Sequence, residues 1–402
     1  MAQTVVIVGA SHASVQAVDT LRREGHAGPI VLVGDEPHLP YNRPPLSKKY
    51  LAGELERDRL WLRSAHFYQQ HRVEMRLGVR ATAIDRAARR VRLGDGSELG
   101  YDALLLCVGS RPRRLDVPGQ DLAGIHCLRT IADVDAIRAD LAGARSMVVV
   151  GAGYIGLEAA ACARQLGLDV TVLETAERPL ARVVAPEVAA FYERRHAREG
   201  VRILCNQRVT GFGGSGRVSV VLCGEQEYPA DLVVVGVGIL PDVTLAEAAG
   251  LRCDNGVWVD EQCRTSDPAV YAAGDCNNHP SVRYRRRVRL ESVDNAVEQA
   301  RTAAANICGK QARHENVPWF WSDQYDVKLQ IAGLSEGCDQ TVLRGDPGSG
   351  SFALYYLAAG ELIAVDAVNS MRDFMNGKKW IAEHKRPDPA RLADPSVDLK
   401  TI

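Results

Sequence analysis

Two glycine-rich turns, each directly after a run of β-branched residues, constrain the fold of this chain more than any other feature. The first is VVIVGASHAS at 5–14, and the second is VVVGAGYIGLE at 148–158. A strand, a tight glycine turn and a helix N-terminus together form the element that holds the pyrophosphate of a dinucleotide. One such turn indicates a nucleotide site. Two in a chain of 402 residues predict two dinucleotides that exchange electrons.

The order of elements around both turns is that of a βαβ unit. Around the first turn we expect strands at 4–8 and 29–34 and a helix over 14–24. Around the second we expect strands at 145–153 and 168–174 and a helix over 155–166. Two more apolar runs, DALLLCVG at 102–109 and DLVVVGVG at 231–238, are predicted to be buried parallel strands that close one sheet each.

The pattern changes after Pro318 to aromatic and mixed strand segments, with a predicted hairpin over 352–369. This part reads as a separate α+β domain. The last segment, 387–402, is rich in Pro, Asp and Ala and is expected to pack loosely on the surface. The predicted fold class is therefore α/β, with two Rossmann-type dinucleotide-binding domains and a C-terminal α+β domain.

Composition narrows the classes of partner and compartment. The formal net charge is −1 with 25% charged residues, so no global field favours nucleic acid, and any charged docking must be local. Ten cysteines form no CxxC pair, and the first strand begins at Thr4, which leaves no room for a signal peptide. We expect a cytoplasmic protein with free thiols. No run of about 18 apolar residues predicts a membrane span.

The second turn carries the full pattern of a nicotinamide dinucleotide site. Gly151, Gly153 and Gly156 allow a tight turn, a close backbone approach to the pyrophosphate and close helix packing. Glu174 ends the next strand, where its carboxylate can accept hydrogen bonds from the adenosine ribose and would repel a 2′-phosphate. This favours NADH over NADPH, although Arg178 and Arg182 nearby leave the strictness of that preference open.

The first turn departs from the pattern, because Ser11 and Ser14 stand where the second and third glycines after Gly9 are usual. A serine hydroxyl can donate a hydrogen bond in exchange for the space that its Cβ takes. Asp35 and Glu36 end the following strand, and either can accept from a ribose. The segment TSDPAVYAAGDC at 265–276 then places Asp275 in a loop next to this turn, where it can accept from a ribityl hydroxyl. A flavin has a ribityl chain, whereas nicotinamide dinucleotides have none.

Several long segments resemble the FAD-dependent NADH:ferredoxin reductases of the glutathione-reductase structural class. They are LPYNRPPLSK (39–48), YIGLEAAA (154–161), GVGILPD (236–242), TSDPAVYAAGD (265–275), VRLESVDNAVEQA (288–300) and PWFWSDQYDVKLQIAGLSEG (318–337). The resemblance implies an FAD domain at 1–114 and 243–316, an inserted NAD domain at 115–242, and a C-terminal domain at 317–402. It also implies electron delivery from NADH to a small [2Fe-2S] ferredoxin that serves a cytochrome P450.

The resemblance carries over to individual positions. On the flavin side it implies contacts by Ala13, Asp35, Arg43, Lys48, Ala81, Arg129, Asp275 and Val293, with Trp321 near the ring. On the nicotinamide side it implies contacts by Gly151, Gly153, Ile155, Gly156, Glu158, Glu174, Gly236 and Gly238. Lys48 is implied at the flavin edge and Glu158 as its partner, so these two residues are the predicted catalytic pair. The two serines of the first turn, and CVGSRP at 107–112, depart from the family pattern.

The cysteines bear on where the electrons go next. Disulfide reductases of this architecture need two cysteines a few residues apart beside the flavin, and no such pair follows either turn. Cys107, Cys162 and Cys276 read as small core residues. An external one-electron acceptor is therefore expected, and no metal site is predicted.

A basic docking surface would suit an acidic ferredoxin. The candidates are Arg285, Arg286 and Arg287 in RYRRRVR (283–289), together with Arg301, Lys378 and Lys379. Three alternatives remain from the sequence: a rubredoxin reductase, an NADH oxidase-type flavoenzyme, and a non-enzymatic flavoprotein that senses NADH. Peroxide-reducing relatives generally carry a redox cysteine near Lys48, and 39–50 contains none.

Overall fold

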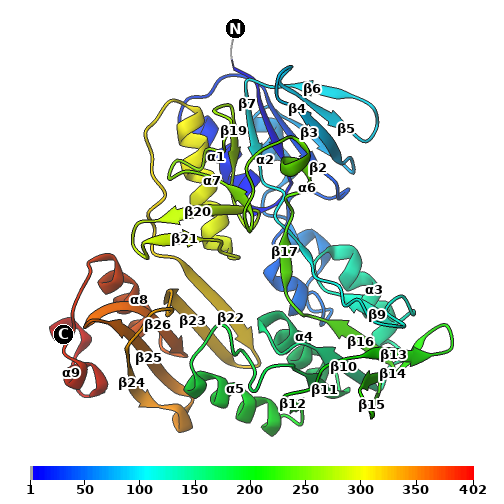
Figure 1. The fold of residues 1–402 in the computed structure, drawn as a ribbon, viewed down its shortest axis with the longest axis vertical. Helices are drawn as coiled ribbons and strands as arrows, with labels where there is room; N and C mark the ends of the chain where they lie inside the picture. Colours follow the sequence, from blue (N-terminus) through cyan, green and yellow to red (C-terminus); the bar gives the residue numbers. More distant parts are fainter. Residues whose placement is uncertain (1–2) are drawn as a thin grey trace. The chain divides into compact units, whose positions relative to one another are not determined.

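The computed structural model describes residues 3–402, and the contacts within it divide the chain into two compact units (Figure 1). Unit 1 comprises 1–42, 57–111 and 240–316, and unit 2 comprises 43–56, 112–239 and 317–402. Both units are discontinuous in sequence. Strands β8 (Ser110–Pro112) and β17 (Ile239–Pro241) fall where the chain passes from one unit to the other. The boundaries of the three domains expected from the sequence stay a prediction.

Unit 1 is built around a five-stranded parallel sheet in the order β19-β7-β1-β2-β3 (Figure 1). Its strands are β1 (Val5–Val8), β2 (Ile30–Gly34), β3 (Val73–Leu77), β7 (Ala103–Leu106) and β19 (Val270–Ala272). Its helices are α1 (His12–Arg23), α2 (Ala65–Gln70), α6 (Thr244–Ala248) and α7 (Val293–Ile307). Smaller sheets are formed by β4 (Ala81–Asp85), β5 (Arg90–Leu93) and β6 (Glu98–Gly100), and by β18 (Val257–Trp258), β20 (Asn277–Ser281) and β21 (Arg286–Val288).

Strand β1 is buried on both faces, which explains its unbroken β-branched run. Val5 and Ile7 pack into the core shared with α1 and α7, whereas Val6 and Val8 pack into the core on the side of β4, β5 and β6. The predicted strands at 4–8 and 29–34 and the helix near 14–24 are therefore confirmed, with the helix beginning two residues early.

Unit 2 contains the second parallel sheet, in the order β12-β11-β10-β16-β9. Its strands are β9 (Ile125–Cys127), β10 (Ser146–Val150), β11 (Asp169–Leu173), β12 (Arg202–Leu204) and β16 (Leu232–Val235). The helices of this part are α3 (Ile131–Leu141), α4 (Tyr154–Gln165) and α5 (Pro186–Arg198), and an antiparallel sheet is formed by β13 (Gly211–Gly214), β14 (Val218–Cys223) and β15 (Gln226–Pro229).

One topological expectation was wrong. The strands predicted at 102–109 and 231–238 exist as β7 and β16, but neither closes its sheet. Strand β19 lies beyond β7, and β9 lies beyond β16. Both edge strands have three residues, too few for the sequence pattern to distinguish them from loop.

The rest of unit 2 contains a five-stranded antiparallel sheet in the order β22-β23-β26-β25-β24. Its strands are β22 (Trp319–Gln324), β23 (Val327–Gly333), β24 (Gln340–Asp346), β25 (Ser351–Ala358) and β26 (Glu361–Val368), followed by helices α8 (Met371–Ala382) and α9 (Pro389–Ala393). Strands β25 and β26 form the hairpin predicted at 352–369.

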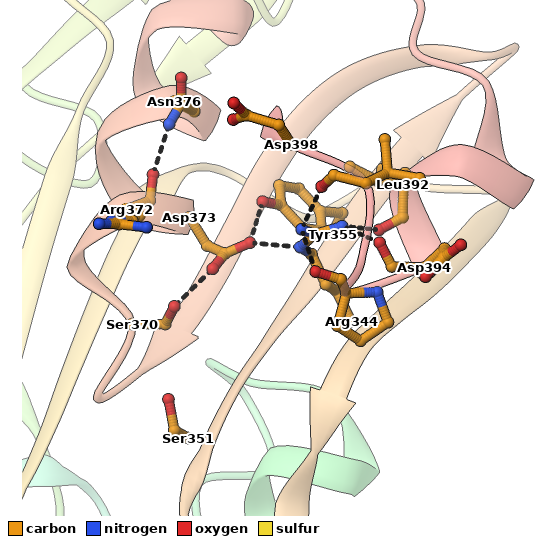
Figure 2. A network of polar contacts seen from close by, with 12 residues as sticks. Arg344, Ser351, Tyr355, Ser370, Arg372, Asp373, Asn376, Leu392, Asp394 and Asp398 are labelled. Atoms are coloured by element: carbon orange, nitrogen blue, oxygen red, sulfur yellow. Dashed lines mark hydrogen bonds and ion pairs between the residues drawn. The ribbon is translucent and has the colours of Figure 1, made fainter. Parts of the chain in front are cut away.

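The C-terminal segment is anchored, contrary to the expectation of loose packing (Figure 2). The buried guanidinium of Arg344 donates to the backbone oxygens of Leu392 at 3.2 Å and Asp394 at 2.5 Å, and also to those of residues 395 and 397. Its Nε lies 3.3 Å from Asp373 Oδ1, which accepts from Tyr355 OH at 2.6 Å. One arginine thus satisfies carbonyls that a short terminal helix leaves unpaired.

Candidate functional site

The second glycine turn leaves a backbone surface open at the N-terminus of α4. Gly153 is the N-cap, and a Cβ built on it would meet no atom within 4 Å. Ile155, next along the helix, has 44% of its surface exposed. An open turn at a positive helix end suits a pyrophosphate. The residues present therefore fit a dinucleotide.

Glu174 lies beside the second turn and braces it. Its Oε2 accepts from the Ala152 amide at 2.7 Å, and its Oε1 accepts from the Ala176 amide at 2.8 Å. Arg178 donates to the carbonyls of Ala181 and Val184, within its own loop. Gly236, at the end of β16, faces the turn, because its carbonyl lies 2.5 Å from a Cβ built on Gly151. Gly238 has a left-handed φ of 101°.

In unit 1 the first turn is held by a pair of serine contacts. Ser14 Oγ accepts from the Ser11 amide at 2.9 Å and donates to the Ser11 carbonyl at 2.8 Å. Gly9 has a φ of 108°, and a Cβ there would lie 2.1 Å from the Cys107 carbonyl oxygen. The turn is thus closed by hydroxyl contacts where the second turn has glycine.

The other predicted flavin residues of unit 1 lie on different elements. Asp275 accepts from Ser110 Oγ at 2.8 Å, so the departing CVGSRP segment supplies one of its partners. Asp35 is exposed, and Glu36 is partly buried and accepts from Tyr41 OH at 2.7 Å. Ala81 lies in β4, Ala13 in α1, and Val293 opens α7 behind the N-cap Ser292.

The remaining predicted flavin residues belong to unit 2. Arg43 donates to the Arg129 carbonyl at 2.7 Å, which joins two predicted residues. Trp321 lies on β22 and stacks on Trp319 with ring centroids 5.4 Å apart.

Lys48 and Glu158 form a buried ion pair within unit 2, with Lys48 Nζ 2.6 Å from Glu158 Oε2. The Glu158 side chain is 2% exposed. Two hydroxyls also donate to it: Ser47 Oγ to Oε2 at 2.5 Å, and Ser322 Oγ to Oε1 at 2.6 Å. A buried carboxylate needs such partners. The pair expected from the resemblance is therefore brought together, and the sequence analysis missed both serines.

The cysteine expectation holds for the described residues, where all ten cysteines are free. Cys162 is the one that approaches the ion pair, with its Sγ 3.7 Å from the Lys48 carbonyl oxygen. Burial raises the pKa of Cys162 to about 12 and that of Cys276 to about 12. Burial also raises the pKa of Cys107 well above its usual value. These thiols stay protonated at neutral pH and do not act as nucleophiles.

The six predicted docking cations differ in how free their charges are. Arg285 and Arg286 are exposed in the β20–β21 turn. Arg287 lies 3.4 Å over the ring of Trp258 and donates to the Val259 carbonyl at 2.7 Å, so it serves the local fold.

The other three docking candidates also have different surroundings. Arg301 is paired with Glu298 at 2.5 Å. Lys378 lies 5.3 Å over the Trp319 ring, and Lys379 is exposed.

Taken together, the two parallel sheets, the two turns and the buried ion pair define a two-dinucleotide flavoprotein oxidoreductase. The model for the pyridine nucleotide-disulphide oxidoreductases matches residues 3–300, and a reductase C-terminal model matches 319–402. The chain belongs to this family and to its group of ferredoxin reductases. It is an oxidoreductase of the class that uses FAD and NAD(P)H.

Full-length relatives share this architecture. A ferredoxin–NAD(P)(+) reductase of a Sphingomonas species is 44% identical, covering 99% of this chain and 97% of the relative. The reductase in the covalent putidaredoxin reductase–putidaredoxin complex matches with a TM-score of 0.96 and 44% identity over 99% of this chain and 97% of that one. The ferredoxin reductase for the CYP199A2 system of Rhodopseudomonas palustris matches with a TM-score of 0.97 and 43% identity over 99% of both chains. No helix in the described part of the chain is long and apolar enough to cross a membrane.

Proposed function

We propose that this protein is a cytoplasmic, NADH-dependent ferredoxin reductase that passes single electrons to a [2Fe-2S] ferredoxin serving a cytochrome P450. The observation that carries the proposal is the buried Lys48–Glu158 pair in a chain whose described cysteines are all free thiols. Full-length likeness to a putidaredoxin reductase and to the reductase of a CYP199A2 system supports the partner class.

The proposed FAD site draws on both units. It comprises Gly9, Ser11, Ala13, Ser14, Asp35, Ala81, Asp275 and Val293 from unit 1, and Arg43, Lys48, Arg129 and Trp321 from unit 2. Asp35 is our choice for the ribose acceptor, because Glu36 already accepts the Tyr41 hydroxyl. We propose that 1–114 with 243–316 binds FAD and that 115–242 binds NADH. FAD accepts a hydride from NADH and releases the electrons one at a time.

The proposed NADH site is formed by Gly151, Gly153, Ile155, Gly156, Glu158, Glu174, Gly236 and Gly238. The preference for NADH rests on the carboxylate of Glu174, which would repel a 2′-phosphate. Arg178 does not offset this charge, because both ends of its guanidinium donate to loop carbonyls. Glu174→Ala is therefore expected to narrow the ratio of NADH to NADPH efficiency.

The proposed role of the ion pair is positioning and charge. Glu158 and the Pro44 carbonyl hold the Lys48 ammonium, at 2.6 Å and 3.3 Å. A positive charge fixed in advance lowers the barrier where negative charge develops, because no reorganisation is needed during the reaction. The raised pKa of Cys162 supports an external acceptor, since the thiol approaching this pair is not nucleophilic.

Stopped-flow reduction by NADH tests this function. Lys48→Met is expected to slow flavin reduction about 100-fold while NADH affinity changes little. An unchanged rate would reject the role of Lys48. The reduced enzyme is then mixed with a [2Fe-2S] ferredoxin, a rubredoxin, dioxygen or cytochrome c. Fast transfer to the ferredoxin supports the proposal, a preference for rubredoxin or dioxygen replaces it, and no turnover with any acceptor indicates a sensor.

Docking is tested by salt and by charge removal. Of the six cations, Arg285, Arg286 and Lys379 are the exposed ones, so we propose that they attract an acidic ferredoxin. Arg285→Gln with Arg286→Gln should raise KM for ferredoxin and flatten its rise with salt. The exposed Arg198 on α5 provides a charge-matched control, Arg198→Gln. Equal effects of the two changes would remove the assignment to the β20–β21 turn.

A further inference from the structure

A chain of hydrogen bonds leads away from Glu158 through the interior of unit 2. Ser322 Oγ lies 2.6 Å from Glu158 Oε1, and Gln324 Nε2 lies 3.2 Å from Ser322 Oγ. His196 Nε2 lies 2.8 Å from Gln324 Oε1, and Tyr325 OH lies 3.1 Å from His196 Nδ1. The links come from α4, α5 and β22 with its following turn, so the chain ties separate elements to one carboxylate.

The carboxylate fixes the direction of every link. An ionised Glu158 can only accept, so Ser322 Oγ must donate to it. Ser322 Oγ then accepts from the Gln324 amide group, which turns the Gln324 carbonyl oxygen toward His196. His196 Nε2 must therefore carry the hydrogen, and its Nδ1 must accept from Tyr325 OH. All four donors point toward Glu158, and bonds aligned in this way strengthen one another.

The interior links are shielded from water and keep the protonation that this direction requires. Ser322 and His196 are 0% exposed, and Gln324 is 1% exposed. Burial lowers the pKa of His196 to about 4, so its ring is neutral at pH 7 and has one donor and one acceptor. Burial raises the pKa of Tyr325, so its hydroxyl remains a donor.

We propose that Ser322, Gln324, His196 and Tyr325 are positioning residues for the reaction between the two dinucleotides. They fix Oε1 of Glu158, which leaves Oε2 facing Lys48 and so holds the ammonium in place. The proposal rests on the roles given above to Lys48 and Glu158. It adds a defined tautomer of a buried histidine and a network that includes a tyrosine four links away.

The tautomer can be measured directly. In holoenzyme with ¹⁵N-labelled histidine rings, His196 should show the Nε2–H tautomer from pH 6 to 8, assigned by loss of its signals in His196→Gln. An Nδ1–H ring, or a ring that becomes charged in this range, would overturn the proposal. This readout does not depend on activity.

Kinetics tests the function of the chain. Ser322→Ala should slow flavin reduction by NADH about tenfold with little change in the Kd for NADH. Ser322→Thr, which restores a hydroxyl, should recover most of the rate. Tyr325→Phe should slow reduction about twofold, because it removes the most distant donor. The matched control is Tyr192→Phe, whose buried hydroxyl has no partner among the described residues and whose loss should change nothing.

A double-mutant cycle separates this inference from the proposed function. If Ser322 acts through Glu158, Ser322→Ala should have no further effect in a Glu158→Gln background. Additive effects, or an unchanged rate in Ser322→Ala when Glu158→Gln is slow, would overturn the inference and leave the proposed function intact. No effect of Glu158→Gln itself would instead remove the role proposed for Glu158.

Discussion

The two glycine turns share their first requirement and differ in their third. Gly9 and Gly151 have left-handed φ values of 108° and 103°. A Cβ on Gly9 would lie 2.1 Å from the Cys107 carbonyl oxygen, and one on Gly151 would lie 2.5 Å from that of Gly236. Each carbonyl follows the neighbouring sheet strand. The first glycine is therefore required in both turns by backbone packing, before any ligand is considered.

At the third position the two turns differ. A Cβ on Gly156 would lie 2.1 Å from the Gly151 carbonyl oxygen, so the second turn has no room for a side chain there. The first turn has Ser14 at the corresponding position, and its hydroxyl makes two hydrogen bonds to the Ser11 backbone. The glycine pattern thus combines separate demands, and a hydroxyl can meet one of them when the path of the turn changes.

The largest effect is expected from Gly9→Ala. The added methyl would meet a backbone carbonyl and would force a left-handed φ on alanine, so the cost should exceed about 3 kcal/mol. We expect protein purified without flavin and with a lowered Tm. Gly25→Ala is the matched control, because Gly25 has a φ of 87° with nothing within 4 Å of its Cβ. Normal flavin content in Gly9→Ala would show that the turn can move.

Acid should separate the units that carry the two turns. In unit 1, burial lowers the pKa of His279 to about 3 and that of His314 to about 4. Between those values and the unfolded pKa of about 6.5, the unfolded chain binds protons that the folded unit does not. Stability is therefore lost as pH falls, by about 2 kcal/mol per histidine at pH 5.

Unit 2 contains two shifts of opposite sign. Burial lowers the pKa of His196 to about 4 and raises that of Asp366 to about 7. As pH falls from 7 to 5, folded Asp366 takes up a proton that its unfolded form releases, which offsets His196. Hydrogen exchange at pH 7 and pH 5 should show protection lost from 5–23 more than from 146–165. Equal losses would contradict the assignment, and His314→Gln should reduce the loss in unit 1.

A smaller effect is expected at the third position of the second turn. Gly156→Ala should move the start of α4 and weaken NADH binding about tenfold, while flavin content stays normal. Ser14→Ala is the comparison in the first turn, where losing the two serine bonds should cost about 1 kcal/mol of stability. Titration of both holoenzymes with NADH measures the difference. Tight NADH binding in Gly156→Ala would show that the two turns tolerate a side chain equally.

The sequence predicted local elements well and the support of the site poorly. Strands β1 and β10 and helices α1 and α4 were predicted within a few residues, because β-branched runs and glycine turns are local signals. Ser47 and Ser322 were missed as partners of Glu158, since a single serine carries no pattern and folding alone brings it near. Arg287 was predicted to dock a partner, yet its charge is used on Trp258, which shared no motif with it.

The smallest effect is expected from Ser11→Gly, which makes the first turn more like the second. The change removes a Cβ from the position where Gly153 leaves open space, and it keeps the Ser11 backbone groups that bond to Ser14. The Ser11 hydroxyl has only a 3.5 Å contact with His12 Nδ1 among the described residues, so little is lost within the protein. FAD affinity should stay equal or become tighter, by less than about 0.5 kcal/mol after the entropic cost of glycine. Reconstitution of apoprotein with FAD measures this. A large loss of affinity would show that the Ser11 hydroxyl contacts the flavin nucleotide and that the first turn binds by side chain where the second binds by backbone.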